Sequence, residues 1–427
     1  MKIGIDVSPL QGPHRMRGIG YTTSNFLRAI PKNTKHSFVL YAHRRDDDSI
    51  AFIQSLLPFS EDHYEIRYFV PTINEQPVAG QLKFIVKIGK RLSYLLSYRF
   101  GSKQYGNTRD LGAFIQTDQG QPLPIMRGKK LLIAYDLIPY VLEKDYLWSY
   151  RTSRQNGRTR RSALKSTFNR GLYLRKAAYN ARFADTVLAI SQATKNDFIR
   201  YAHVPKRKIK IVHLGVDRVV SSSDTAPKMQ RFIGTSWGYI QKPASLKGKD
   251  FLLFVGGADN RRKLADLVAA FNQLKARGSN LCLVLSGDTM RGPKAIPSLD
   301  VQHALLSSPF LDDIYFMGFT DDLTKNWLYK NAKAFVFPST YEGFGLPILE
   351  AMEFETPVIC YDNLAVREVG GDTPLFATDV LTLVQAIERL LGMSVKERQK
   401  LIADGRKRSE SFSWETTAKE LLTYAER

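Results

Sequence analysis

Near its C-terminal end the chain reads Phe335-Val336-Phe337-Pro338-Ser339-Thr340-Tyr341-Glu342-Gly343-Phe344-Gly345-Leu346-Pro347-Ile348-Leu349-Glu350-Ala351-Met352. The opening residues are aromatic or β-branched, which is typical of a buried strand, and the Ser, Thr and Gly residues after them break it. Pro347 stands where a proline suits the first turn of a helix. The stretch therefore predicts a strand, a tight loop and a helix start.

The chemistry of this turn favours an anionic ligand. Free backbone N–H groups and the positive end of a helix converge there, which suits a phosphate or diphosphate. Glu342 projects from the loop, and Glu350 lies about one turn into the helix, where it can meet the hydroxyls of a ribose. A glutamate at a helix start can instead serve as a cap or complement the helix dipole. The flexible glycines Gly343 and Gly345 favour the ligand site, because a cap does not need them.

With seven residues between its two glutamates, the stretch resembles the E-x7-E signature of the retaining glycosyltransferases of family 4. The resemblance covers nearly the whole chain, strongly from Phe251 onward and weakly between Ser49 and Gly112, where acceptor specificity usually resides. It implies an α/β protein of the GT-B type, with two Rossmann-like, doubly wound domains facing each other across a cleft. It also implies a nucleoside diphosphate sugar as co-substrate. The donor-binding residues of the motif would be Gly343, Phe344, Gly345, Leu346 and Glu350, with Glu342 holding the transferred sugar.

Length and composition agree with two domains. The chain has 427 residues and 44% apolar content, enough for two cores of about 200 residues each. Strand-like and helix-like stretches alternate in both halves, which predicts doubly wound, mostly parallel sheets. We expect an N-terminal acceptor-binding domain over 1–218, a linker over 219–250 and a C-terminal donor-binding domain over 251–410. A C-terminal helix over 411–427 can cross back to the first domain.

The sequence predicts a cytoplasmic protein. Its two cysteines, Cys282 and Cys360, lie in strand-like apolar runs and are expected to be buried in a reducing compartment. The first seven residues are typical of a strand rather than a signal peptide. No apolar run approaches the roughly 18 residues that span a bilayer. The D-x-D pattern in Asp46-Asp47-Asp48 is interpreted as a solvated turn, and neither a metal nor another cofactor is expected.

The formal net charge of +21 is concentrated in the first half. Residues 1–218 contain 37 Lys and Arg against 16 Asp and Glu, whereas residues 219–427 contain 25 of each kind. Within the first half, Arg151 to Ala184 carries ten basic residues and no acidic one. Such a segment suits an anionic surface or ligand.

A second basic segment, Lys83 to Lys103, mixes cations with apolar residues in an amphipathic pattern. Its candidate acceptor or membrane contacts are Lys83, Lys87, Lys90 and Arg91. Both segments favour an anionic membrane or an anionic acceptor, and the alternative is a solvated helix face. Nucleic acid ranks last, because no nucleic-acid motif accompanies the charge. Peripheral attachment at the inner face of the plasma membrane follows as an expectation.

Other candidate donor contacts lie outside the glutamate motif. Arg261 and Arg262 follow the predicted strand Phe251 to Val255, and their guanidiniums can bracket a diphosphate. In the family resemblance Arg262 takes the place of a lysine, and Phe319 lies in a stretch similar to the one that meets the nucleotide base. Gly18 and Gly20 precede a helix expected from Tyr21, and they either permit close approach of the donor or form a plain tight turn.

The segment Ile133-Ala134-Tyr135-Asp136-Leu137-Ile138-Pro139 resembles the family's "H-D-L-I-P", whose histidine usually faces the donor sugar. Here Tyr135 replaces that histidine. A phenol can donate a hydrogen bond, but its ordinary pKa of about 10 prevents it from acting as a base near neutral pH.

These features predict a retaining glycosyltransferase that moves a sugar from a nucleoside diphosphate to a hydroxyl of a glycan or lipid-linked glycan, in cell-surface polysaccharide or glycoconjugate synthesis. The predicted catalytic residues are Glu342, Arg262 and Tyr135, and no side chain fits as a covalent nucleophile. Two alternatives stay open. One is a catalytically silent partner subunit, which Tyr135 favours, and the other is a nucleotide-sugar epimerase of the same architecture.

Overall fold

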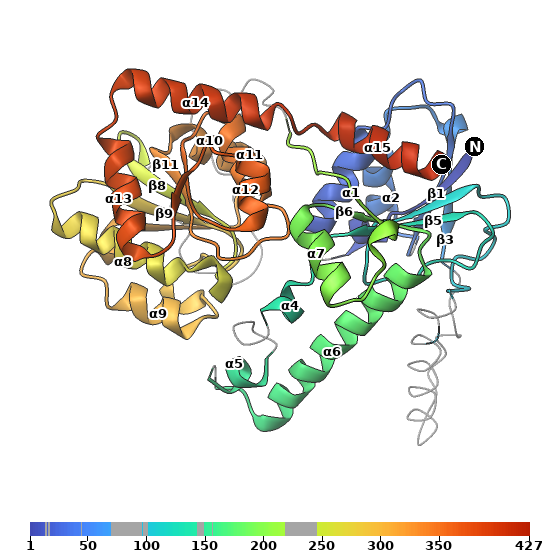
Figure 1. Ribbon diagram of the computed structural model, residues 1–427, viewed down its shortest axis with the longest axis horizontal. Coiled ribbons are helices and arrows are strands. Elements are labelled where there is room, and N and C mark those ends of the chain that lie inside the picture. Colours follow the sequence, from blue (N-terminus) through green and yellow to red (C-terminus); the bar gives the residue numbers. More distant parts are fainter. Residues whose placement is uncertain are drawn as a thin grey trace. The chain divides into compact units, whose positions relative to one another are not determined.

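The computed structural model describes residues 1–12, 15, 18–43, 45–69, 96, 101–142, 149–155, 157–217 and 246–427. The chain folds into two compact units (Figure 1). Unit 1 comprises Met1–Val141, Phe168–Gly215 and Ser413–Arg427, and unit 2 comprises Leu142–Thr167 and Val216–Phe412. The expected linker over 219–250 lies mostly outside the described residues, as do Lys83, Lys87, Lys90 and Arg91.

Unit 1 is built on a seven-stranded parallel sheet with the order β3-β2-β1-β4-β5-β6-β7. The strands are β1 (Lys2–Asp6), β2 (Ser37–Ala42), β3 (Tyr64–Tyr68), β4 (Ala113–Gln116), β5 (Lys129–Ala134), β6 (Thr186–Ala189) and β7 (Ile209–Ile211). Strand β1 lies at the centre, where Ile3 pairs with Phe38 of β2 on one side and with Ala113 of β4 on the other. Its residues Ile3 and Ile5 are fully buried, as expected for a central parallel strand.

The helices of this half of the chain are α1 (Gly18–Arg28), α2 (Asp47–Ser55), α4 (Ile138–Val141), α5 (Tyr150–Gln155), α6 (Arg160–Phe183), α7 (Gln192–Arg200) and, from the C-terminus, α15 (Trp414–Glu426), with 3-10 turns at Ser8–Gln11, Glu61–His63 and Lys206–Lys208. Helix α15 contacts α1, and Figure 1 shows the two side by side.

Two expectations need correction. Helix α1 begins at Gly18, so Gly18 and Gly20 lie in its first turn instead of a preceding loop. Asp47 and Asp48 are exposed, as expected, but they form the first turn of the helix α2, where their charge complements the helix dipole.

Unit 2 is built on a six-stranded parallel sheet with the order β10-β9-β8-β11-β12-β13. The strands are β8 (Phe251–Val255), β9 (Cys282–Ser286), β10 (Ile314–Gly318), β11 (Ala334–Phe337), β12 (Val358–Tyr361) and β13 (Leu375–Ala377). The helices of the segment that forms this sheet are α8 (Leu264–Ala276), α9 (Leu299–Leu306), α10 (Asp322–Asn331), α11 (Leu346–Glu353), α12 (Leu364–Gly370), α13 (Val380–Leu391) and α14 (Val395–Ser409), with 3-10 turns at Asn260–Arg262, Pro293–Ala295 and Leu311–Asp313. By its contacts unit 2 also includes α5 and the first residues of α6.

The strand orders make both sheets doubly wound. In unit 2 the chain moves outward from β8 through β9 to β10, then returns to the other side of β8 and continues through β11 to β13. Right-handed crossovers in opposite directions place their helices on opposite faces. Accordingly, α8 contacts α9 and α13, whereas α11 contacts α10, α12 and α14. The direction reverses between β8 and β11, and in unit 1 it reverses between β1 and β4. Ligands bind outside the carboxyl ends of the strands at such reversal points.

Candidate functional site

The loops after β8 and β11 meet at the reversal point of the unit 2 sheet. Arg261 and Arg262 end the 3-10 turn that follows β8, and Glu342 lies in the loop that follows β11. The two loops are tied together because the Thr340 N–H donates a hydrogen bond of 2.8 Å to the Arg261 carbonyl. The structure thus brings Glu342 next to two arginines that precede it by about 80 positions in sequence.

One oxygen of Glu342 receives the contacts of both arginines. Arg261 Nη1 donates a very short hydrogen bond to Oε1, Ser339 Oγ donates to the same atom at 2.9 Å, and Arg262 Nε lies 3.5 Å from it. The other oxygen, Oε2, has no protein partner in the part of the chain that the structure describes. Burial opposes ionisation of Glu342, but the charges of the two arginines prevail and lower its pKa. The carboxylate is therefore ionised at neutral pH, with one oxygen fixed and one available.

The Arg262 guanidinium occupies space that is open because residue 256 is a glycine. A Cβ atom at Gly256, which directly follows β8, would stand 1.7 Å from Arg262 Nη1. The guanidinium carbon lies 5.6 Å from the centre of the Phe337 ring. Burial lowers the pKa of Arg262, and the neighbouring charge of Arg261 lowers it further. A partly buried cation of this kind is stabilised by a bound anion.

Helix α11 begins beside this cluster, as the sequence predicts. Gly345 precedes the helix with φ +111°, a backbone conformation that disfavours any residue with a Cβ atom, and Pro347 lies in the first turn. The Phe344 side chain is buried and packs edge-to-face on Phe412, with ring centres 6.0 Å apart. The Phe344 ring is therefore engaged in packing and does not stack on a ligand.

Glu350 points toward α10 and not into solvent. Its Oε1 accepts a hydrogen bond of 3.0 Å from Lys325 Nζ, and its Oε2 accepts one of 2.9 Å from the Tyr329 hydroxyl. The side chain is 14% exposed. Because a carboxylate has about four lone-pair sites, two more hydrogen bonds can be accepted. Sequence analysis missed Lys325 and Tyr329, although their i, i+4 spacing places both on one side of α10.

The ends of β9 and β10 complete this edge of the sheet. Gly318 ends β10 with φ +62°, and its N–H donates to the Met290 carbonyl at 2.7 Å. The next residue, Phe319, exposes 54% of its surface. Thr320 Oγ1 lies 3.0 Å from Ser286 Oγ at the end of β9. Phe319 is thus an exposed aromatic ring at the carboxyl edge, where it can stack on a planar base.

The corresponding edge of unit 1 holds a buried carboxylate that sequence analysis did not single out. Asp6 ends β1 and is fully buried. Burial raises its pKa to about 7, even though the Ser8 N–H, at 2.9 Å, and the Gln116 amide both donate hydrogen bonds to it. Gln116 ends β4, so this pair lies at the reversal point of the unit 1 sheet.

Tyr135 lies just after β5 at the same edge of unit 1. Its hydroxyl is buried near Thr22 and Thr23 of α1 and makes no hydrogen bond of normal geometry with the described residues. Burial is the main cause that raises the pKa of Tyr135 above its ordinary value. The phenol is therefore unsuited to act as a base, in agreement with the sequence analysis, but it can donate a hydrogen bond.

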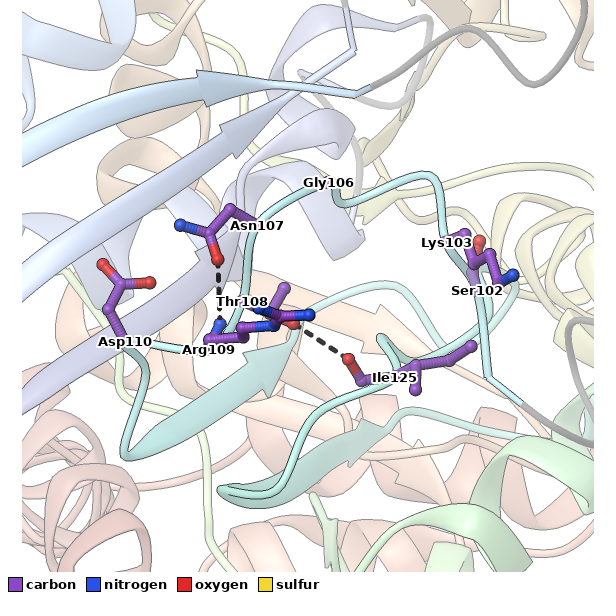
Figure 2. Close-up of a pocket in the computed structure, with 8 residues that line it drawn as sticks. All are labelled: Ser102, Lys103, Gly106, Asn107, Thr108, Arg109, Asp110 and Ile125. Atoms are coloured by element: carbon purple, nitrogen blue, oxygen red, sulfur yellow. Dashed lines mark hydrogen bonds between the residues drawn. The ribbon is translucent and has the colours of Figure 1, made fainter.

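A cavity of about 830 Å³ lies elsewhere in unit 1 (Figure 2). It is lined by Ser102, Lys103, Gly106, Asn107, Thr108, Arg109, Asp110 and Ile125. Most of these residues lie in the segment that precedes β4 in the chain. None of the predicted site residues lines it. No group of three or more His, Cys, Asp or Glu side chains that could hold a metal ion occurs among the described residues.

One segment of the chain matches a known protein family. Residues 236–408 match the family model described as glycosyl transferases group 1. The chain is 30% identical to the O-antigen chain mannosyltransferase B of Escherichia coli, over 54% of this chain and 58% of that protein. It is 26% identical to the serotype-specific mannosyltransferase WbdA of Escherichia coli, over 98% of this chain and 47% of that protein. The chain spans about half the length of these curated relatives.

Comparison with solved structures identifies the fold of the chain. The chain is similar to HepE of Anabaena in complex with UDP and glucose, with a TM-score of 0.64 at 16% identity over 99% of both chains. It is also similar to WaaG, a glycosyltransferase involved in lipopolysaccharide biosynthesis, with a TM-score of 0.60 at 12% identity over 100% of this chain and 99% of that one. The predicted GT-B fold with two Rossmann-like domains is confirmed. The group 1 match and the named relatives support a glycosyltransferase.

Proposed function

We propose that this protein is a retaining glycosyltransferase of family 4 that transfers a hexose, with mannose as first candidate, from a nucleoside diphosphate to a hydroxyl of a glycan or lipid-linked glycan. The observation that carries the proposal is the convergence of Arg261, Arg262 and Glu342 at the reversal point of the unit 2 sheet. Mannose rests on the printed names of the relatives, two of which are mannosyltransferases. The UDP complex of HepE supports a nucleotide-linked donor.

Departure of the nucleotide leaves positive charge on the sugar and negative charge on the diphosphate. Stabilising that diphosphate charge is the main catalytic task, and we assign it to Arg262, to Arg261 and to the N–H groups of Gly343 to Leu346. Because these donors are fixed in partly buried positions, they need little reorganisation when the charge develops. No metal is invoked, since the guanidiniums and the helix start supply the positive charge.

The two glutamates have different tasks in this proposal. Glu342 Oε1 is held by Arg261 and Ser339, which leaves Oε2 to accept a hydroxyl of the transferred sugar. Glu350 is oriented by Lys325 and Tyr329 and retains capacity to accept the ribose hydroxyls. Phe319 offers the base an aromatic surface. Tyr135, in unit 1, would donate a hydrogen bond and not take a proton.

A nucleotide-release assay tests the proposal. The protein is incubated with GDP-mannose, UDP-glucose and related donors, with and without mannose-terminated oligosaccharide acceptors. We expect acceptor-dependent release from one donor, and a product whose anomeric configuration, measured by NMR, is that of the donor. An inverted product would refute the retaining mechanism. Conversion of the donor without an acceptor would indicate an epimerase, and no turnover with any donor would favour a silent partner subunit.

The variant Arg262→Gln tests the assigned site. We expect kcat/KM to fall by about 10²-fold, as for the loss of one preorganised donor to developing charge. The matched control is Arg277→Gln, because Arg277 is an exposed arginine that follows α8 and pairs with Glu388. Equal activity of the two variants, at equal melting temperature, would remove Arg262 from the site.

A further inference from the structure

Helix α6 exposes a continuous stripe of large apolar and basic side chains. Leu164 is 62% exposed, Phe168 67% and Tyr179 41%. Arg161, Arg175 and Arg182 are exposed as well. These positions follow one another at intervals of three, four or seven residues, which places them on one side of the helix. Figure 1 shows α6 as a single continuous helix.

The opposite side of α6 is the one that packs on the protein. Ala163, Ala177 and Ala181 are buried, and their spacing of four or fourteen residues places them on a common face. Helix α6 thus packs on the protein through one face and exposes the large apolar and basic side chains of the stripe on the other. Exposed apolar residues of this size, gathered in one place, mark an interaction surface.

We propose that the stripe of α6, defined by Arg161, Leu164, Phe168, Arg175, Tyr179 and Arg182, docks on an anionic lipid bilayer. Charge complementarity identifies this occupant. Helix α6 carries seven basic residues and no acidic one, so it is attracted to anionic headgroups. Its leucine and aromatic side chains can enter the boundary between headgroups and acyl chains while the arginines remain at the headgroups.

The same composition disfavours other occupants. A second copy of the chain would present an equally basic stripe, and like charges would oppose the pairing. A nucleic acid would neutralise the charge of the arginines but would not bury the apolar side chain of Leu164. No helix in the described part of the chain is long and apolar enough to cross a membrane. Docking of a surface helix is therefore the mode of attachment that this segment offers.

The placement of α6 gives the docking a consequence for the acceptor, which rests on the proposed function. The Tyr173 hydroxyl donates to the Asp136 carbonyl at 3.0 Å, and Asn180 Nδ2 donates to the Gln121 carbonyl at 2.6 Å. Asp136 follows β5, and Gln121 lies in the segment after β4. Helix α6 thus joins the lipid-facing stripe to the carboxyl edge of the unit 1 sheet. A lipid-linked acceptor could reach that edge without leaving the bilayer.

Vesicle co-sedimentation of the full chain, without any sugar nucleotide, tests the docking. We expect binding to vesicles of phosphatidylcholine and phosphatidylglycerol in equal parts, at least about tenfold weaker binding to phosphatidylcholine alone, and release as salt rises toward about 0.5 M. The double variant Leu164→Ser/Phe168→Ser and the triple variant Arg161→Glu/Arg175→Glu/Arg182→Glu should each weaken binding to the anionic vesicles by about tenfold or more.

Matched controls separate the stripe from general exposure and charge. Leu299→Ser/Leu306→Ser changes two leucines of α9 that are 50% and 51% exposed. Lys396→Glu/Lys407→Glu/Lys419→Glu reverses three exposed lysines on α14 and α15. Both controls should bind anionic vesicles like the parent. The proposal is overturned if neutral and anionic vesicles bind equally, if the α6 variants bind as the controls do, or if single-stranded RNA binds more tightly than the vesicles and competes with them.

The same variants keep this inference separate from the proposed function. Transfer to a water-soluble acceptor should be unchanged in Leu164→Ser/Phe168→Ser, because neither residue is among those assigned to the donor site. Transfer to a lipid-linked acceptor in anionic vesicles should fall at least about tenfold. If the parent shows no turnover with either acceptor, the glycosyltransferase proposal is contradicted, but the docking proposal is still decided by the vesicle experiment.

Discussion

Asp6 shows at the residue scale how burial sets a charge state at the unit 1 edge. Its carboxyl group accepts hydrogen bonds from the Ser8 N–H and the Gln116 amide, which favour the ionised form. Burial outweighs both and raises the pKa from 3.8 to about 7. The folded protein therefore keeps a proton on Asp6 at pH values where the unfolded chain has lost it.

This difference predicts how stability depends on pH. Between about pH 4 and pH 7 the folded state binds more protons than the unfolded state, so the contribution of Asp6 to stability falls as pH rises and is constant above pH 7. Each unit of the pKa difference corresponds to about 1.4 kcal/mol. In Asp6→Asn this titration is absent. We expect the melting temperature of Asp6→Asn, relative to the parent, to rise steadily from pH 4 to pH 7.

The comparison uses relative melting temperatures because asparagine also changes one hydrogen bond at this position, a change that does not depend on pH. Asp48→Asn serves as the control, since Asp48 is an exposed carboxylate of α2 in the same unit. A constant offset between Asp6→Asn and the parent over this pH range would mean that Asp6 is ionised in the folded protein throughout.

At the element scale, the start of α11 depends on one backbone conformation. Gly345 has φ +111°, and a Cβ atom built there would meet Ile348 Cδ1 at 3.5 Å, an ordinary contact. The cost of a larger residue is therefore backbone strain rather than a collision. We expect Gly345→Ala to lower the free energy of unfolding of unit 2 by roughly 1–3 kcal/mol, measured by thermal or urea unfolding. It should also weaken donor binding, because the N–H groups at the helix start would shift.

Gly392→Ala is the matched control for this glycine. Gly392 follows α13 with φ −85°, which any residue can adopt, and its Cβ would lie 3.4 Å from the Glu388 carbonyl. A loss of stability equal to that of Gly345→Ala would show that the added methyl group, and not the conformation at Gly345, is responsible.

The sequence predicted the central elements of the fold better than its edges. The run from Phe335 to Met352 forms the expected strand, loop and helix, because buried parallel strands are continuous apolar runs. Strands β3 and β13 were not predicted. Both lie at the edges of their sheets, β3 carries Glu65 and Arg67, and β13 has three residues. As an edge strand, β3 can carry charges and lacks a continuous apolar run, whereas β13 is apolar but too short to stand out in the sequence.

The sequence suggested individual site residues but not their contacts. Glu342, Glu350, Arg261 and Arg262 were selected from residue types and positions along the chain, and their roles stay a prediction. The pairing of the arginines with one oxygen of Glu342 depends on the loop after β8 meeting the loop after β11, which only the strand order determines. The start of α1 at Gly18 was missed because glycines are weak helix formers and their tertiary surroundings override that preference.

At the scale of the whole molecule, the chain passes twice from unit 1 into unit 2 and returns to unit 1 for its last helix. Helix α15 contacts α1, β4 and β5 (Figure 1). Trp414 packs edge-to-face on Tyr21 with ring centres 6.0 Å apart, and Thr417 Oγ1 donates to the His213 carbonyl at 2.7 Å. Leu421 is 2% exposed. The last fifteen residues are thus part of the unit 1 core, far in sequence from its strands.

This arrangement predicts that damage to α15 destabilises unit 1 and leaves unit 2 intact. Leu421→Ala removes buried apolar groups and should lower the free energy of unfolding of unit 1 by about 2–5 kcal/mol. Lys419→Ala, on the exposed side of the same helix, should change this free energy by no more than about 0.5 kcal/mol.

Hydrogen exchange measured by mass spectrometry follows each unit separately. Faster exchange should appear in the unit 1 strands β1, β4 and β5. The unit 2 strands β8 and β11 should keep the protection of the parent, because α1, β4 and β5, which α15 contacts, all belong to unit 1. Equal loss of protection in β8 and β11 would mean that the two units unfold together and that the core of unit 1 is not a separate cooperative structure.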